Sequence, residues 1–93
     1  MNNSKQIVVY SKQHCPFCRM ARQMLDNKGV DYELIDIEGK HEVRERMIEL
    51  AGRKTVPQIF FGDHHVGGFD DLNALEQKGD LDPLLADVTG ASA

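Results

Sequence analysis

The amino-acid sequence predicts an α/β fold, a four-stranded mixed sheet with helices on both faces, and three observations lead to this class. Two short apolar runs, at residues 6–10 and 30–37, are separated by one helix length, which predicts a βαβ unit with parallel strands. Residues 57–61 and 64–66 flank a turn and predict a hairpin. The remaining segments carry helical apolar faces, which are buried when they pack on the two sides of the sheet.

The first half of the chain contains the βαβ unit. Residues 6–10 are rich in β-branched side chains and predict a buried strand. The helix that follows begins at Pro16, which suits a first turn, and ends before Gly29, which suits the position after a helix. Between them apolar residues recur along one helical face. Residues 30–37 alternate between apolar and charged side chains, which predicts the second strand.

The second half of the chain begins with an apolar helical face over about 43–51 and continues with the hairpin. Asp70 is the predicted N-cap of a third helix that runs to Lys78. The pair Asp82-Pro83 predicts the start of a last short helix, because it combines a capping residue with a first-turn proline. The predicted order is therefore β-α-β-α-β-β-α with a terminal turn of helix.

Bulk properties favour one small globular domain. The 93 residues predict a single domain, with a core of about 6–86 and a tail at 87–93. We expect no membrane segment, because no apolar run approaches about 18 residues. The first residues lack the apolar stretch of a secretory signal, so we expect a cytoplasmic location. The net charge of −4 argues against nucleic-acid binding. We also expect the chain to be a monomer.

Two cysteines, Cys15 and Cys18, stand three positions apart where the first strand passes into the first helix. A disulfide between them would close a very short loop and stabilise the fold by only about 2 kcal/mol, against about 4.7 kcal/mol for a disulfide that closes a 100-residue loop. The pair is therefore poorly placed for a structural disulfide. We expect Cys15 at the N-cap, where the N–H groups of Phe17 and Cys18 and the helix dipole favour its thiolate. Cys18 lies one turn inside and should be more covered. The pattern predicts Cys15 as the nucleophile and Cys18 as the resolving thiol.

Two other uses of the cysteine pair are less favoured. Two ordinary buried cysteines would fit poorly with Pro16 at the first helical position and a polar loop before it. A zinc site requires four ligands, yet the chain has no second cysteine pair and none of its four histidines has ligand spacing to the first. We therefore expect no bound metal.

Three motifs in the chain support a closer comparison. They are Ser11-Lys12-x-x-Cys15-Pro16-Phe17-Cys18, Thr55-Val56-Pro57-Gln58-Ile59-Phe60 and Gly67-Gly68-Phe69-Asp70-Asp71. In order and spacing they resemble the motifs of bacterial dithiol glutaredoxins, over about residues 6–86. The resemblance implies a thioredoxin fold, glutathione as reductant and co-substrate, and disulfide-bonded or glutathionylated proteins as substrates. Two positions depart from the family pattern, since Phe17 stands where tyrosine is usual and Phe69 where a small residue is common.

The resemblance also implies a glutathione site. A cis Val56-Pro57 peptide would leave the backbone of Val56 free to pair with the extended tripeptide. The N–H groups of Phe69 and Asp70 would bind the γ-glutamyl carboxylate, and the Asp70 side chain its amine. Lys12, with Arg44 second, is expected at the glycyl carboxylate, whereas other nearby cations such as Arg53 are expected mostly to be solvated. The predicted set comprises the catalytic Cys15 and Cys18 and the glutathione-binding Lys12, Phe17, Arg44, Thr55, Val56, Pro57, Gly68, Phe69 and Asp70.

Two alternative functions remain open at this point. One is a thioredoxin-like reductant served by a flavoprotein reductase, although the absence of tryptophan and the Pro-Phe pair between the cysteines oppose it. The other is a carrier in which Cys15 thiolates of two chains bridge an iron–sulfur cluster with glutathione as co-ligand. Visible absorbance after anaerobic purification would distinguish this carrier from the enzyme.

Overall fold

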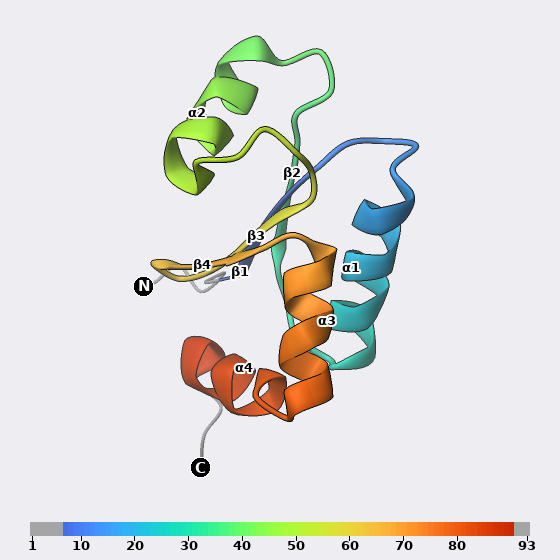
Figure 1. Cartoon of the computed structure of the whole chain (residues 1–93), viewed down its shortest axis with the longest axis vertical. Coiled ribbons are helices and arrows are strands. Elements are labelled where there is room, and N and C mark those ends of the chain that lie inside the picture. Colours follow the sequence, from blue (N-terminus) through green and yellow to red (C-terminus); the bar gives the residue numbers. More distant parts are fainter. Residues whose placement is uncertain (1–6, 91–93) are drawn as a thin grey trace.

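The computed structural model describes residues 7–90, and its elements follow the predicted order (Figure 1). The strands are β1 (Ile7–Ser11), β2 (Glu33–Asp36), β3 (Gln58–Phe61) and β4 (His64–Gly67), and the helices are α1 (Pro16–Asn27), α2 (His41–Ala51), α3 (Phe69–Lys78) and α4 (Leu81–Thr89). The sheet order is β2-β1-β3-β4. β1 pairs with β2 in parallel and with β3 antiparallel, and β3 and β4 form the antiparallel hairpin. The predicted mixed sheet is therefore confirmed.

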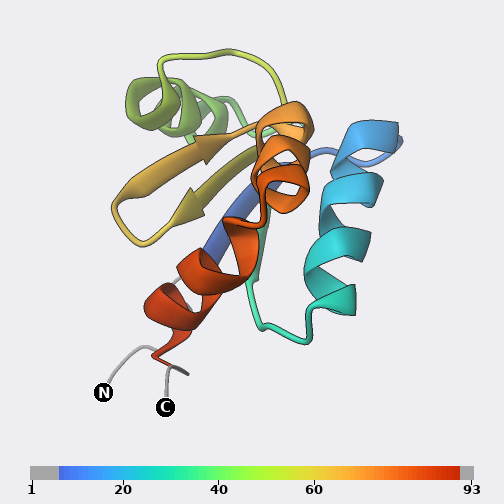
Figure 2. The ribbon, with the colours of Figure 1, turned by 60° about the horizontal axis from the view of Figure 1, so that its bottom comes forward.

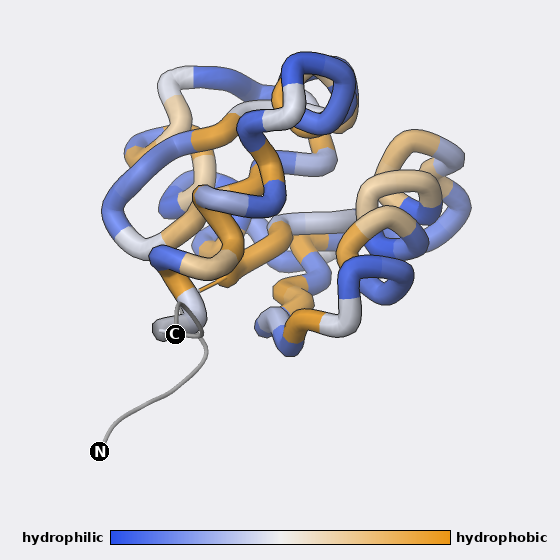
Figure 3. The backbone as a smooth tube through the Cα atoms, turned by 90° about the horizontal axis from the view of Figure 1, so that it is seen from below, coloured by the Kyte–Doolittle hydropathy of each residue, from blue (hydrophilic) through white to orange (hydrophobic). Residues whose placement is uncertain are grey.

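Alternate residues of β1 enter two separate cores, which places helices on both faces of the sheet. Ile7 and Val9 are fully buried against α1, α3 and α4. Tyr10 faces the other way and joins a smaller core with Met47 of α2. Figure 2 shows α1 and α3 together on one side and α2 on the other, and Figure 3 shows hydrophobic segments alternating with hydrophilic ones along the backbone. Burial of each large aliphatic side chain in these cores stabilises the folded state by about 1.5–3 kcal/mol.

The second strand is shorter than predicted. It spans Glu33–Asp36 rather than 30–37. The amide of Val30 still donates to the carbonyl of Leu25 and so belongs to the C-terminal closure of α1. The Tyr32 hydroxyl donates to Asp26, 3.0 Å away, which also ties this segment back to the helix. Val30 and Tyr32 are partly buried against the larger core, whereas Leu34, the next apolar residue of the pattern, is exposed.

The starts of the last two helices also differ from the prediction. α3 has Gly68, not Asp70, as its N-cap, because the carboxylate of Asp71 accepts the Gly68 N–H from the third helical position. α4 begins at Leu81 with Asp80 as its N-cap, rather than at Asp82-Pro83. The fully buried side chain of Leu81 explains the earlier start, and a proline in the first turn sacrifices no helical hydrogen bond.

The predicted tail begins too early, because α4 continues through residues 87–89. Val88 packs against the larger core, and the Thr89 hydroxyl donates to the carbonyl of Leu85 at 2.7 Å. Residue 6 of the predicted first strand and residues 91–93 lie outside the described part. Within residues 7–90, no helix has both the length and the apolar character required to cross a membrane.

The arrangement of α1 and α3 positions the functional site. The two helices lie against each other and begin at neighbouring ends, which are their upper ends in Figure 1 and lie below α2 in that view. The loop that leads into β3 passes close to these ends. All three motifs from the sequence therefore converge there.

Candidate active site

Cys15 is the N-cap of α1, as predicted. Its backbone is extended, with φ −118° and ψ 106°, and Pro16 follows at the first helical position. The sulfur accepts a hydrogen bond from the Cys18 N–H at 3.2 Å. The predicted second bond, from the Phe17 N–H, is not among the hydrogen bonds of the described residues. No acidic side chain lies in the first turn of α1, so nothing there offsets the positive end of the helix dipole at the sulfur.

The residue before the nucleophile has an unusual backbone. His14 has φ 57°, the only positive φ among the described non-glycine residues. Histidine is among the side chains that enter this left-handed region more readily than branched ones. The turn at His14 takes the chain from the loop after β1 into the extended conformation of Cys15, which leaves that side chain partly exposed.

Cys18 lies one turn into α1 and is fully buried. Burial raises the pKa of its thiol above the ordinary value of 9.0, and the hydrogen bond with Cys15 raises it further. The backbone of Lys12 and the side chain of Ser11 act in the opposite direction, but their effect is smaller. Cys18 is therefore a covered thiol held in its protonated form next to a partly exposed sulfur, as the sequence predicted.

The loop before β3 lies opposite Cys15. The Val56–Pro57 peptide is cis, as expected, and the Val56 carbonyl oxygen is 3.9 Å from the Cys15 sulfur. The buried amide of Gln58 holds the loop by donating to the Thr55 carbonyl at 3.0 Å and the Thr55 hydroxyl at 3.2 Å. The Gln58 oxygen is in turn 2.7 Å from Nε2 of His65 on β4.

A groove of about 420 Å³ runs between this loop and the start of α3. Phe17 and Phe69 stack at one side of it, with ring centroids 6.3 Å apart and planes at 26°. The Phe17 side chain is 54% exposed, so the pair presents an apolar surface to solvent. The groove brings together most of the predicted binding residues: Phe17, Thr55, Val56, Pro57, Gly68, Phe69 and Asp70.

The two predicted cations, Lys12 and Arg44, lie elsewhere. Both line a second hollow of about 310 Å³ between the loop after β1 and the start of α2. None of the residues that line the groove also lines this hollow. The structure therefore brings Lys12 and Arg44 together but separates them from the groove residues.

Two further residues line the groove that the predicted set omits, Arg53 and Asp71. Arg53 is exposed, in line with the expectation of a solvated cation, and its Nη2 also donates to Oδ2 of Asp71 at 2.9 Å. The hydrogen bond from Gly68 and then the one from Arg53 lower the pKa of Asp71 below its ordinary value of 3.8. Its position in the sequence could have identified Asp71, because an acidic residue three positions after Gly68 fits a capping box at the start of a helix.

The possible metal-ligand side chains of residues 7–90 do not form a cluster. No group of three or more histidine, cysteine, aspartate or glutamate side chains is close enough there to hold an ion.

A partly exposed N-cap sulfur, a buried partner thiol one turn on, and a groove beside them define a thiol–disulfide oxidoreductase on a thioredoxin fold. Comparison with known proteins identifies the family within this class. The family model "Glutaredoxin" matches residues 7–66. The chain belongs to the glutaredoxin family, and its activity is glutathione-dependent thiol–disulfide oxidoreduction.

Individual relatives agree with this assignment. The chain is 48% identical over 79 residues to glutaredoxin 3 of Escherichia coli K12, covering 85% of this chain and 95% of that protein. It is 50% identical over 80 residues to a glutaredoxin of Pseudomonas aeruginosa, covering 86% and 95%. The crystal structure of a buckwheat glutaredoxin–glutathione complex superimposes with a TM-score of 0.86 at 31% identity, covering 98% and 84%.

Proposed function

We propose that Cys15 is the nucleophile of this enzyme and that the groove between Val56 and the start of α3 holds the glutathione part of its substrates. One observation carries the proposal, the hydrogen bond from the Cys18 N–H to the Cys15 sulfur, which lies 3.9 Å from the carbonyl oxygen of the groove residue Val56. An amide N–H at a helix start stabilises a thiolate, and the thiolate is the form that attacks a disulfide.

The first reaction uses one cysteine. The Cys15 thiolate attacks the glutathione sulfur of a protein–glutathione mixed disulfide, a Cys15–glutathione disulfide forms, and the protein thiolate leaves and takes up a proton. The thiolate of a second glutathione then attacks the bound glutathione sulfur, which regenerates the Cys15 thiolate and releases glutathione disulfide. Each turnover consumes one free glutathione, and the other half of the glutathione disulfide comes from the substrate, so atoms, electrons and charge balance.

The second reaction uses both cysteines. Cys15 attacks a protein disulfide and forms a mixed disulfide with the substrate. Cys18 loses its proton, attacks Cys15, and displaces the reduced substrate as a Cys15–Cys18 disulfide forms. Two glutathione molecules then reduce that disulfide. The raised pKa of Cys18, due mainly to burial, favours its protonated form and so favours Cys15 as the sulfur that attacks first.

The groove supports specific contacts to glutathione. The Val56 backbone would pair with the cysteinyl residue in the manner of an added strand. The first-turn N–H groups of Phe69 and Asp70 would bind the γ-glutamyl carboxylate, and the Asp70 carboxylate the amine. Lys12 and Arg44 would bind the glycyl carboxylate in their separate hollow, which requires the tripeptide to extend past Cys15 toward α2. Orientation of this kind accelerates exchange because it holds the three sulfurs in line.

The proposal extends to the setting of the enzyme. We expect residues 1–93 to act as one monomeric domain on glutathionylated and disulfide-bonded proteins of a reducing cytoplasm. The spacing of the two cysteines supports this setting, since a free pair with little value as a staple serves catalysis where thiols stay reduced.

A coupled assay tests the function. The purified chain is mixed with a glutathionylated peptide, glutathione, glutathione reductase and NADPH, and NADPH oxidation is followed. We expect turnover that depends on glutathione. We expect no turnover when thioredoxin reductase replaces glutathione and glutathione reductase. Turnover with thioredoxin reductase alone would instead assign the thioredoxin-like function.

A further inference from the structure

A single carboxylate oxygen connects two segments that face each other across the groove. Oδ2 of Asp71, in the first turn of α3, accepts the Gly68 N–H at 2.9 Å. The same oxygen accepts from Nη2 of Arg53, which precedes the loop into β3, also at 2.9 Å. The Arg53–Asp71 ion pair thus joins the segment that carries Thr55 and Val56 to the glycine turn before Phe69.

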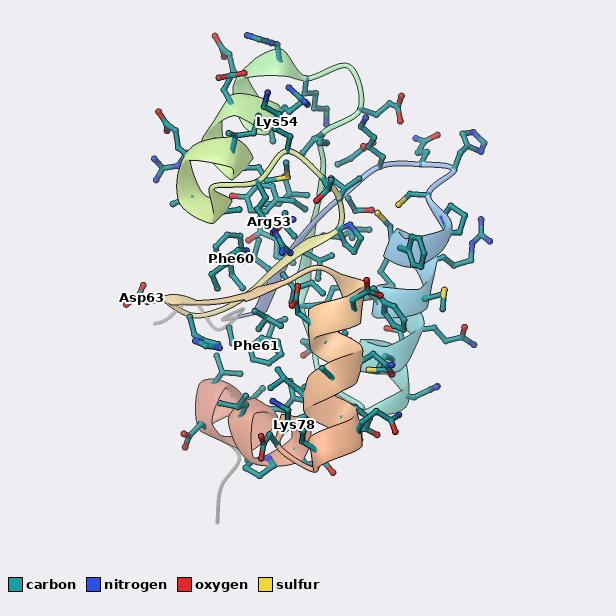
Figure 4. The ribbon with its side chains drawn as sticks, in the orientation of Figure 1. Arg53, Lys54, Phe60, Phe61, Asp63 and Lys78 are labelled. Atoms are coloured by element: carbon teal, nitrogen blue, oxygen red, sulfur yellow. The ribbon has the colours of Figure 1, made fainter. Side chains whose placement is uncertain are left out.

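The guanidinium of Arg53 lies directly over this glycine turn. A Cβ atom at Gly67 would collide with the Asp71 carboxylate and lie 3.0 Å from Nη2 of Arg53. A Cβ at Gly68 would lie 3.6 Å from the same nitrogen. In Figure 4 the Arg53 side chain lies near the start of α3, whereas the neighbouring Lys54 lies beside α2. The absence of side chains at Gly67 and Gly68 therefore gives Arg53 room to reach Asp71.

The ion pair also changes the charge at the start of α3. The N–H groups of the first turn have no partner within the helix, and Gly68 has no side chain with which to cap them. They are suited to a carboxylate, yet Asp70 and Asp71 both stand in that turn and would repel one. Arg53 offsets the charge of Asp71, which reduces the repulsion of an anion at this turn to that of Asp70.

We propose that Arg53 is a positioning residue of the glutathione groove, which it prepares by holding Asp71 and neutralising it. Arg53 acts through Asp71 on the N–H groups of Phe69 and Asp70. This inference rests on the proposed function, in which those groups bind the γ-glutamyl carboxylate. It assigns a role in substrate binding to a cation outside the predicted set.

The experiment measures KM and kcat separately for the glutathionylated peptide in the coupled assay. The variants are Arg53→Gln, Arg53→Lys, Asp71→Asn and the double variant Arg53→Gln/Asp71→Asn. Lys54→Gln is the matched control, because it removes an adjacent positive charge that does not line the groove. Urea unfolding of each variant reports whether the fold is retained.

We expect Arg53→Gln to raise KM about 5–30-fold with kcat little changed, the range for a loss of one or two kcal/mol. Arg53→Lys recovers part of the loss, since it keeps the charge but has a single donor centre. The double variant has a KM no higher than Arg53→Gln, because its second substitution removes the charge that Arg53 neutralises. Lys54→Gln behaves as the wild type.

Three results would overturn the inference. They are an unchanged KM in Arg53→Gln, an equal rise in Lys54→Gln, and a double variant whose losses simply add. If Arg53→Gln fails to fold, Asp71→Asn and Arg53→Lys decide by the same comparison of KM with kcat. A wild-type chain that does not turn over the peptide would refute the proposed function itself, and the inference with it.

Discussion

The amide nitrogen of Cys18 lies 3.2 Å from the sulfur of Cys15 and donates a hydrogen bond to it. The residue that is proposed to resolve the mixed disulfide thus also supports the nucleophile, through its backbone rather than its side chain. Substitution of the Cys18 side chain leaves this N–H in place. The two roles of Cys18 can therefore be separated by mutation.

The first prediction concerns this separation. Cys15→Ser should abolish all reductase activity, whereas Cys18→Ser should retain reduction of glutathione mixed disulfides and lose reduction of protein disulfides. The coupled assay with a glutathionylated peptide and, in parallel, a disulfide-bonded protein checks both. A Cys15→Ser variant with most of its activity would refute the assignment of the nucleophile.

The second prediction concerns Gly67, which has φ 118° and the Asp71 carboxylate where a Cβ would lie. Gly67→Ala should lower the free energy of unfolding by about 1–2 kcal/mol for the positive φ and by a further 1–3 or so for overpacking. Gly79→Ala is the control, because Gly79 has φ 78° with nothing within 4 Å of a Cβ. Urea denaturation measures both, and equal losses would show that the contact with Asp71 is unimportant.

The third prediction tests whether the hollow lined by Lys12 and Arg44 binds the glycine end of glutathione. Lys12→Gln and Arg44→Gln should each raise KM for a glutathionylated peptide about 5–30-fold, because each removes a cation proposed to bind the glycyl carboxylate. With a mixed disulfide of γ-glutamylcysteine, which lacks the glycine, the same substitutions should leave KM unchanged. A rise of similar size with both substrates would argue that these cations act elsewhere.

The fourth prediction is a pH dependence of stability. Burial, followed by the charge of Arg53, lowers the pKa of His65 below its ordinary value of 6.5. The unfolded chain therefore binds a proton more readily, so stability should fall as the pH drops below about 6.5 toward the lowered value. His65→Gln should weaken this slope in urea unfolding between pH 7 and 5, while His64→Gln, at an exposed neighbour on β4, should not. An unchanged slope in His65→Gln would contradict the prediction.

The sequence predicted those parts of the fold and site that depend on local chemistry. Pro16 and Gly29 bound the first helix because their backbone preferences act where they stand, and Cys15 became its N-cap for the same reason. Relationships across the chain were missed. The ion pair of Arg53 was missed because its partner, Asp71, lies 18 residues away on another element. The separation of Lys12 and Arg44 from the groove likewise depends on how α2 packs, which no local pattern encodes.

The nucleophile and the groove are tested together by intact mass spectrometry of the Cys18→Ser variant after one turnover with a glutathionylated peptide, without free glutathione. The proposed mechanism predicts a protein that carries one glutathione, mapped to Cys15 by digestion, with the peptide released as a free thiol. A protein that carries the peptide instead, or no adduct at all, would contradict it.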